Sequence, residues 1–308
     1  MSTTRFRYVT ADVFTDQPFG GNQLAVFPDA RGIPEERLLD VTREFNYSET
    51  TFVYPPADRS HTRRVRIFTP GGEVPFAGHP TVGTAHALAA IGDLPLEGEV
   101  TRITFEENVG VIPVAIRARG GVPTFTQLTV AKLPETGPPP PSREALAAAL
   151  DLSEDDLLAG EWTPQALSCG LPFLFVPVRD VAAVARSRIR VDAWDRATAG
   201  AWTREIFVFA RGGTRQDTDY HARMFAPALN VPEDPATGSA CAALAGYLAP
   251  RDPRIARDGT LRWVIEQGFE MGRPSIVEVE ADVARRAVTA VRVGGSSVLV
   301  CEGTMAIG

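Results

Sequence analysis

Two stretches of this chain repeat one pattern, and an internal repeat constrains the fold more than any other feature of the sequence. The first stretch reads Arg66-Ile-Phe-Thr-Pro70 and then Gly78-His-Pro-Thr-Val-Gly-Thr-Ala85. The second reads Arg223-Met-Phe-Ala-Pro227 and then Glu233-Asp-Pro-Ala-Thr-Gly-Ser-Ala240. Each has a strand-like Arg-x-Phe-x-Pro, followed by Pro-x-x-Gly-(Thr/Ser)-Ala at the opening of an Ala-rich segment. A repeated unit of this kind predicts two similar halves.

The order of the predicted elements repeats as well. In each half, short strands precede one Ala-rich helix, at 81–91 in the first half and 237–248 in the second, and further strands follow it. Strands outnumber helices and short turns join many of them, which favours antiparallel or mixed sheets. The two Ala-rich helices are apolar on nearly every face, which is typical of a buried helix. We therefore expect an α+β fold of two similar domains, each a curled mixed or antiparallel sheet around a central helix.

A Pro-rich segment separates the halves. Residues 133–142 contain five prolines and cannot continue a helix or a central strand. We expect an N-terminal repeat over 1–130, a linker over 131–142 and a C-terminal repeat over 143–294. The last strand, about 295–308, can pack back onto the N-terminal repeat.

Charge and cysteine content exclude several classes of partner. The net charge is −7 and there is no basic run, which argues against nucleic acid and against an anionic membrane surface. No apolar stretch is long enough for a transmembrane helix, and no secretory signal is visible at the N-terminus. The three cysteines are far apart, so we expect reduced thiols in a cytoplasmic protein. Nucleotide-binding and hydrolase motifs are absent, and no cofactor is expected.

The starts of the two Ala-rich helices are candidate binding sites. A helix start carries backbone N–H groups without intrahelical partners, and its dipole favours an anion. Small and hydroxyl-bearing residues gather there: Gly78, Thr81, Thr237, Gly238 and Ser239. Two such starts that face each other would hold a small molecule bearing a carboxylate. The alternative is that the small residues only permit close packing of the helices.

Three ionisable side chains are candidates for chemistry. His79 and Asp234 each precede the shared proline of the repeat, which suggests that they divide acid and base work between them. Glu49 begins an apolar strand, where its pKa would be raised. Taken singly, Asp234 could be a helix cap, His79 a structural histidine and Glu49 a solvated strand end. The three could also hold a metal, but their spacing does not indicate a metal site, and none is expected.

Five motifs carry a family resemblance over nearly the whole chain. They span residues 12–27, Ser48-Glu-Thr-Thr-Phe-Val53, Phe76-Ala-Gly-His-Pro-Thr-Val-Gly83, Glu233-Asp-Pro-Ala-Thr-Gly-Ser-Ala240 and Glu266-Gln-Gly-Phe-Glu-Met-Gly-Arg-Pro-Ser275. With these motifs the chain resembles the phenazine-biosynthesis PhzF-like isomerases, which have the diaminopimelate epimerase-like fold. The resemblance implies two similar domains with the site in the cleft between them.

The resemblance also implies a cofactor-free isomerisation. Glu49 would be the general acid/base that relays a proton between carbons, with His79 and Asp234 flanking the substrate and assisting protonation. Gly78, Gly238 and Ser239 would supply contacts to the substrate, which in the phenazine enzyme is a dihydro-hydroxyanthranilate. Members of the family are commonly homodimers. The chain differs from the epimerase branch of the fold, which has a cysteine at each helix start, so a two-thiol mechanism is not expected.

These observations favour a cofactor-independent isomerase that acts on a small carboxylate-bearing substrate. One alternative is a small-molecule binding protein that keeps the cleft without turnover. Another is a metal-assisted lyase or hydrolase.

Overall fold

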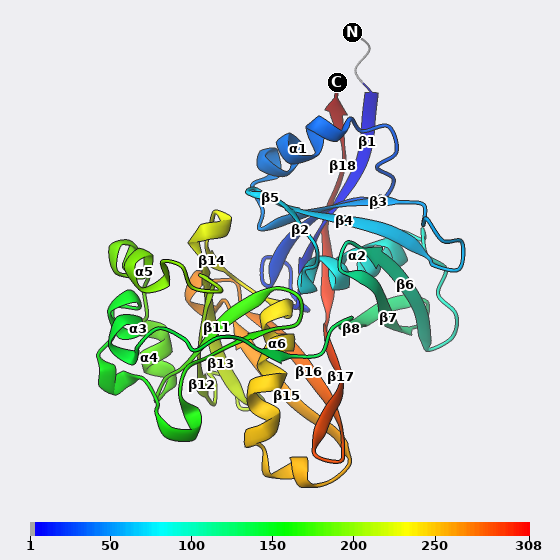
Figure 1. Cartoon of the computed structure of the whole chain (residues 1–308). Helices are drawn as coiled ribbons and strands as arrows, with labels where there is room; N and C mark the ends of the chain where they lie inside the picture. Colours follow the sequence, from blue (N-terminus) through cyan, green and yellow to red (C-terminus); the bar gives the residue numbers. More distant parts are fainter. Residues whose placement is uncertain (1–3) are drawn as a thin grey trace. The chain divides into compact units, whose positions relative to one another are not determined.

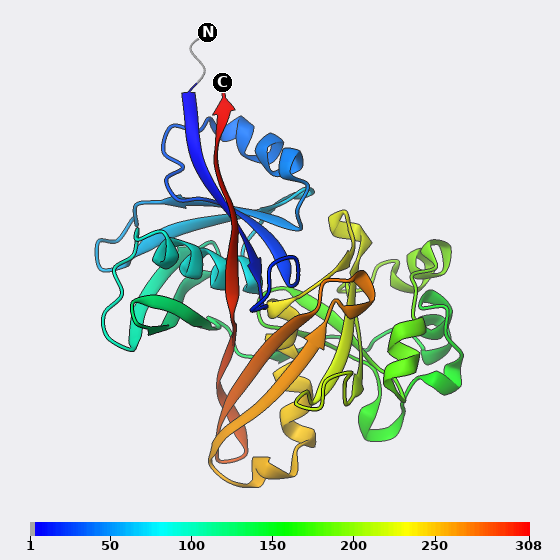
Figure 2. The same cartoon turned by 180° about the vertical axis from the view of Figure 1, so that it is seen from behind.

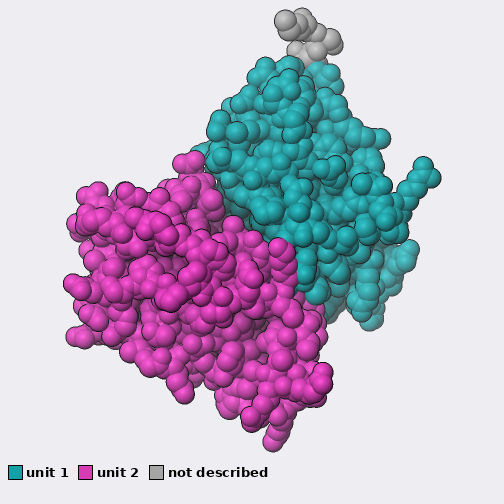
Figure 3. Space-filling model, viewed as in Figure 1, with its two compact units in different colours: residues 1–131, 293–308 teal, residues 132–292 magenta. Residues whose placement is uncertain are grey.

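The computed structural model describes residues 4–308, which belong to two compact units (Figure 3). Unit 1 consists of residues up to 131 together with 293–308, and unit 2 consists of residues 132–292. The chain therefore leaves unit 1 once and returns to it at its end. The segment 131–142, expected as a linker, belongs to unit 2 from Lys132 onward and contains the short strand β9 (Glu135–Thr136).

Unit 1 is a mixed sheet with two α-helices and a short 3-10 helix, Glu35–Arg37 (Figure 1). The α-helices are α1 (Leu38–Phe45) and α2 (Gly78–Ala90). The strands are β1 (Thr4–Val13), β2 (Asn22–Phe27), β3 (Glu49–Tyr54), β4 (Arg63–Thr69), β5 (Gly72–Val74), β6 (Val100–Glu107), β7 (Gly110–Arg119), β8 (Val122–Thr129) and β18 (Ser297–Ile307).

The first and last strands of the chain pair with each other in unit 1. β18 runs antiparallel to β1 from Thr4↔Ile307 to Val13↔Ser297. Figure 2 shows β18 beside β1 along the length of the unit. The N-terminal half of the sequence therefore needs the last residues of the chain to complete its sheet.

Unit 2 has the same type of sheet and more helices. Its helices are α3 (Arg143–Ala149), α4 (Val181–Arg186), α5 (Val191–Thr198) and α6 (Gly238–Leu248). Besides β9, its strands are β10 (Gln165–Ser168), β11 (Pro172–Pro177), β12 (Ile206–Arg211), β13 (Tyr220–Ala226), β14 (Val231–Asp234), β15 (Gly259–Gln267) and β16 (Ser275–Ala284), and β17 (Ala287–Gly295) follows them.

Strand pairing confirms the predicted duplication. In unit 1 the successive pairs β1–β2, β2–β3, β3–β4, β4–β6 and β6–β7 are antiparallel, parallel, antiparallel, parallel and antiparallel. In unit 2 the pairs β10–β11, β11–β12, β12–β13, β13–β15 and β15–β16 follow the same series. Each unit also adds one short antiparallel strand, β5 on β4 and β14 on β13.

A buried helix occupies the centre of each unit, as the apolar pattern predicts. Every residue of α2 from Gly78 to Ala89 is buried, and in α6 only Gly246 is not. α2 packs on β1, β2, β3 and β8, and α6 packs on β10, β11 and β16. Among residues 4–308, no helix combines the length and apolarity that crossing a membrane requires.

The structure corrects the alignment of the two copies. The Arg-x-Phe-x-Pro strands do correspond, but Ile67 pairs with Val74 in unit 1, whereas Met224 pairs with Asp234 in unit 2. α2 begins at Gly78, four residues after Val74, and α6 begins at Gly238, four residues after Asp234.

The positional equivalent of Asp234 is therefore Val74, and that of His79 is Ser239. The expectation that His79 and Asp234 occupy matching positions was wrong. The proline used as a landmark in the first copy, Pro80, lies inside α2, and the true counterpart of Pro235 is Pro75.

Candidate active site

Glu49 and His79 lie together in unit 1. β2 and β3 are parallel, and Leu24 is opposite Glu49, so the first residues of both strands lie at the same end of the strand pair. His79 is in the first turn of α2, and its Nε2 lies 3.4 Å from Glu49 Oε2. The imidazole is almost fully buried, whereas the carboxylate retains 15% of its side-chain exposure. Glu49 is thus the member of the pair that can reach a ligand.

Asn22 fixes the orientation of the imidazole. Its Nδ2 lies 3.1 Å from His79 Nδ1, within hydrogen-bond distance of the buried ring. Burial lowers the pKa of His79 to about 3, and hydrogen bonding with the Gln23 backbone opposes this only in part. The ring is therefore neutral near pH 7.

Thr81 faces the interior of unit 1. It is fully buried, and its hydroxyl lies 2.8 Å from the Ala77 carbonyl and 2.6 Å from Glu107 Oε1. Burial raises the pKa of Glu107 to about 8, so this carboxyl group is largely protonated near pH 7. A hydroxyl has one proton, and both contacts are satisfied when Thr81 donates to the carbonyl and accepts from the protonated acid. The predicted contact between Thr81 and a substrate remains a prediction.

Asp234 and Thr237 lie together in unit 2. Asp234 ends β14, and Thr237 is the residue before α6. The Thr237 hydroxyl donates to Asp234 Oδ2 at 2.5 Å, so a buried carboxylate is held beside the start of a buried helix. Gly238 and Ser239 follow in the first turn and are also buried.

Gln267, at the end of β15, makes hydrogen bonds to both Asp234 and Thr237. Its Nε2 donates to the Asp234 carbonyl at 2.7 Å and to Thr237 Oγ1 at 3.1 Å, and its Oε1 accepts from the Thr237 amide at 3.1 Å. Gln267 is completely buried. One side chain therefore satisfies backbone groups of both residues and fixes the position of the carboxylate between them.

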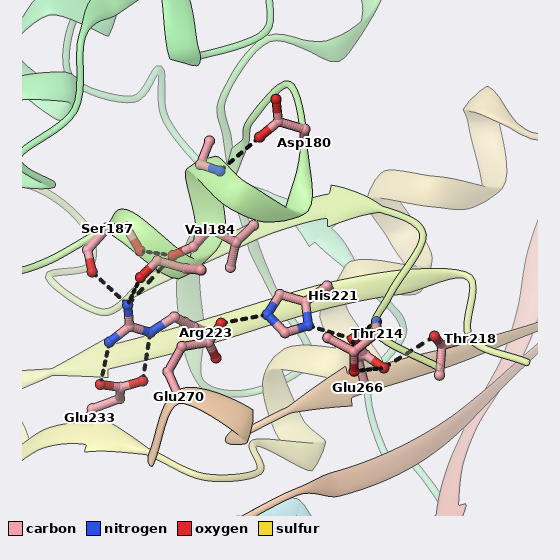
Figure 4. A network of polar contacts seen from close by, with 12 residues as sticks. Asp180, Val184, Ser187, Thr214, Thr218, His221, Arg223, Glu233, Glu266 and Glu270 are labelled. Carbon is pink, nitrogen blue, oxygen red and sulfur yellow. Dashed lines mark hydrogen bonds and ion pairs between the residues drawn. The ribbon is translucent and has the colours of Figure 1, made fainter. Parts of the chain in front are cut away.

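Glu266, the residue before Gln267 in β15, belongs to a separate charged network (Figure 4). His221 Nδ1 lies 2.6 Å from Glu266 Oε1, and its Nε2 lies 2.7 Å from Glu270 Oε1. Burial by itself lowers the pKa of His221, but the two carboxylates outweigh it and raise the pKa above its ordinary value. Both ring nitrogens can then donate, as an imidazolium does.

Arg223 and Glu233 extend the network along β13. The guanidinium makes two bonds of 2.7 Å to the Glu233 carboxylate and also donates to the Ser187 carbonyl at 2.6 Å. Arg66, its counterpart in unit 1, is paired in a similar way with Glu35 and Glu73. The repeated arginine of the sequence pattern therefore anchors the strand that precedes each central helix.

Both helix starts lack a side-chain cap. Neither Ala77, before α2, nor Thr237, before α6, accepts a hydrogen bond from its helix through its side chain. The first-turn N–H groups have no partners within the helix, which suits an anionic ligand.

Gly83 lies a turn and a half further into α2 and has a packing role. A β-carbon at this position would lie 2.5 Å from a methyl group of Val13 and 2.7 Å from one of Leu24. For this residue, the reading that small side chains only permit close packing is correct.

Sequence reasoning missed three residues that complete these arrangements: Asn22, Glu107 and Gln267. Each is a polar side chain at the end of a strand with an apolar core pattern, and that placement was the available signal. Within the described part of the chain, no group of three or more His, Cys, Asp or Glu side chains is arranged to hold a metal ion.

Comparison with known proteins gives consistent matches over the full length. The model of the phenazine biosynthesis-like protein family, PhzC-PhzF, matches residues 11–303. An uncharacterized isomerase of Mesorhizobium japonicum is 38% identical, with 97% of this chain and 98% of the relative covered. The trans-2,3-dihydro-3-hydroxyanthranilate isomerase of Pseudomonas aeruginosa is 35% identical, with 96% and 98% covered.

Solved structures match the fold in the same way. The PhzF-family phenazine biosynthesis protein of Bacillus anthracis superposes with a TM-score of 0.87 at 25% identity, covering 99% of this chain and all of that one. A hydroxyproline epimerase from Agrobacterium vitis has a TM-score of 0.67 at 14% identity, covering 99% and 92%, which shows a shared fold alone. The predicted α+β, epimerase-like fold is confirmed, and the chain is an isomerase that belongs to the phenazine biosynthesis-like PhzC-PhzF family.

Proposed function

We propose that this protein is a cofactor-independent isomerase that moves a proton between two carbons of a small carboxylate-bearing substrate. The substrate would bind in a cleft between the two units, with the start of α2 on one side and the start of α6 on the other. The observation that carries the proposal is the contact between Glu49 and His79 at an uncapped start of a buried helix.

Glu49 would act as the base and then as the acid. Its carboxylate would take a proton from a C–H group activated by conjugation, and the electron pair would shift into the conjugated system. The protonated Glu49 would then return the proton to a different carbon, so that atoms and charge balance without a co-reactant.

His79 and Asp234 would assist from either side. A neutral His79, whose Nε2 lies 3.4 Å from Glu49 Oε2, would pack against that carboxylate and keep it in one orientation. Asp234, held by Thr237 and Gln267, would meet a polar group of the substrate. First-turn N–H groups at Gly78, and at Gly238 with Ser239, would bind the substrate carboxylate.

The experiment is turnover in D₂O with trans-2,3-dihydro-3-hydroxyanthranilate, the compound named for the Pseudomonas aeruginosa relative. We expect deuterium at one carbon of the product. Glu49→Gln should lower kcat by about 10²–10⁴-fold with binding retained, the usual contribution of a general acid/base. Glu44→Gln, an exposed change in α1, is the matched control and should leave kcat unaltered.

The outcomes separate the alternatives. Binding without any deuterium incorporation would favour the non-catalytic binding protein. Full turnover by Glu49→Gln would refute the role of this residue. Turnover lost on dialysis against a chelator and restored by a metal would favour the metal-assisted lyase or hydrolase.

The family resemblance also supports a homodimer, and the three widely separated cysteines support a cytoplasmic location. Sedimentation at micromolar concentration tests the dimer, because a monomer and a dimer of a 33.2 kDa chain are well separated.

A further inference from the structure

A cavity of about 330 Å³ lies in unit 2 near the C-terminal end of α6. It is separated from Gly238 by the length of that helix, roughly 16 Å at ~1.5 Å per residue. Its volume falls in the range of small-molecule pockets, about 300–1,000 Å³. The walls combine flat aromatic rings with charged groups: Trp162, Arg211, Asp219, Tyr220, Leu248, Arg251, Asp252, Pro253, Arg254 and Trp263.

Tyr220 supplies a donor to the cavity. The residue as a whole is only 7% exposed, and it is one of the residues that line the cavity. A hydroxyl group that lines a cavity can bind a polar group of a guest. Burial raises the pKa of Tyr220, so the phenol keeps its proton and donates.

Two arginines bring positive charge without a carboxylate partner in the described part of the chain. The Arg211 guanidinium lies 4.6 Å from the centre of the Trp162 ring and makes no hydrogen bond there. The Arg251 guanidinium lies 3.7 Å from the centre of the Tyr247 ring and donates to the carbonyls of Glu161 and Tyr247. The second of these bonds offsets the negative end of the α6 dipole.

The remaining charges leave the cavity positive. Arg254 is paired with Asp252 through two guanidinium nitrogens, and Asp219 Oδ2 accepts from the Val264 amide at 2.8 Å. The lining therefore holds three arginines and two aspartates, a net charge of +1 (3 − 2), in a protein whose net charge is −7.

We propose that this cavity is a second binding site, for a small anion that carries a flat ring, such as an aromatic carboxylate. The carboxylate would accept from the Tyr220 hydroxyl and from Arg211, a charge-assisted contact. The ring would lie against Trp162, where aromatic surfaces stack at little entropic cost. The proposal is independent of the proposed function, because none of these residues belongs to the helix starts or to the Glu49 pair.

The test is a calorimetric titration of the full chain with benzoate, with tryptophan fluorescence as a second readout. We expect saturable binding of one equivalent that Arg211→Gln weakens about tenfold or more, the loss of a charged hydrogen bond. Tyr220→Phe should weaken it by a smaller factor and leave the fold unchanged. Arg196→Gln, an exposed change in α5, is the control and should not alter the affinity.

Three further probes decide the chemical class. Cyclohexanecarboxylate should bind more weakly than benzoate, and inorganic sulfate and benzylammonium should bind weakest. Sulfate binding as tight as benzoate would overturn the role of the ring, and a preference for benzylammonium would overturn the role of the arginines. The proposal also fails if benzoate does not saturate, or if Arg211→Gln binds it unchanged, because the ion would then bind elsewhere, including at the helix starts.

Discussion

Replacing Thr237 by valine removes one hydroxyl and keeps the shape of the side chain. That hydroxyl donates to Asp234 Oδ2 at 2.5 Å and accepts from Gln267 Nε2 at 3.1 Å. Gln267 keeps its bonds to the Asp234 carbonyl and to the amide of residue 237, and only its second Nε2–H loses an acceptor. The main loss is one hydrogen bond to a carboxylate, so we expect the free energy of unfolding to fall by about 1.5–3 kcal/mol at pH 7.

Urea unfolding followed by tryptophan fluorescence measures this loss for unit 2 alone. The chain has four tryptophans, at positions 162, 194, 202 and 263, and all of them lie within residues 132–292. Thr237→Ser is the matched control, because it keeps the hydroxyl and should recover most of the stability. A valine variant within about 0.5 kcal/mol of the parent, the usual range for a neutral surface change, would refute the reasoning, as would a serine variant that is equally unstable.

Three further predictions concern stability. The raised pKa of His221 means that its contribution is fully present below pH ~6.5 and is lost as pH rises through the folded-state pKa, so His221→Asn should destabilise unit 2 more at pH 5.5 than at pH 9 by urea titration. Burial raises the pKa of Glu107 to about 8, so its contribution to the free energy of unfolding changes with pH in the same direction as that of His221. This contribution is present below pH ~4.5 and is lost as the pH rises to about 8. Glu107→Gln should therefore gain stability relative to the parent between about pH 5 and 9, measured by circular dichroism. Gly83→Ala should cost about 1–3 kcal/mol by the same method, because the new methyl group would overlap side chains of Val13 and Leu24, and an unchanged stability would contradict the packing role.

The sequence could predict the architecture because its strongest signals are periodic. Helices apolar on all faces, such as 81–91, had to be buried, and the repeated order of elements predicted two sheets of one type. The end of the first helix was predicted within a residue, but its start was three residues late. His79 was expected before the helix and Pro80 in its first turn, but α2 already begins at Gly78 and includes both residues.

The alignment of the copies could not be fixed by motif matching. Pro-x-x-Gly recurs in both stretches, but in the first copy it starts inside the helix and in the second it starts before it. Only the strand pairs Ile67–Val74 and Met224–Asp234 determine which residues correspond. A sequence motif does not show which of its residues pairs with which residue of the neighbouring strand.

The residues that support the candidate site were hidden for a related reason. Asn22, Glu107 and Gln267 meet their partners across 57, 26 and 30–33 positions of sequence, respectively. A lone polar residue at a strand end is most often solvated, and only tertiary contact distinguishes the buried ones. The charge states of His79 and Glu107 likewise depend on burial that residue type alone does not reveal.

Pairing of β18 with β1 has a consequence for biosynthesis. A ribosome makes β1 long before β18, so the sheet of unit 1 stays one strand short until β18 has been made. Unit 2 is a continuous stretch, 132–292, and all of it is made before β18. Domains generally fold as units during synthesis. We therefore expect unit 2 to reach its native state before unit 1, and a message that stops before β18 to yield a folded unit 2 attached to an incomplete unit 1.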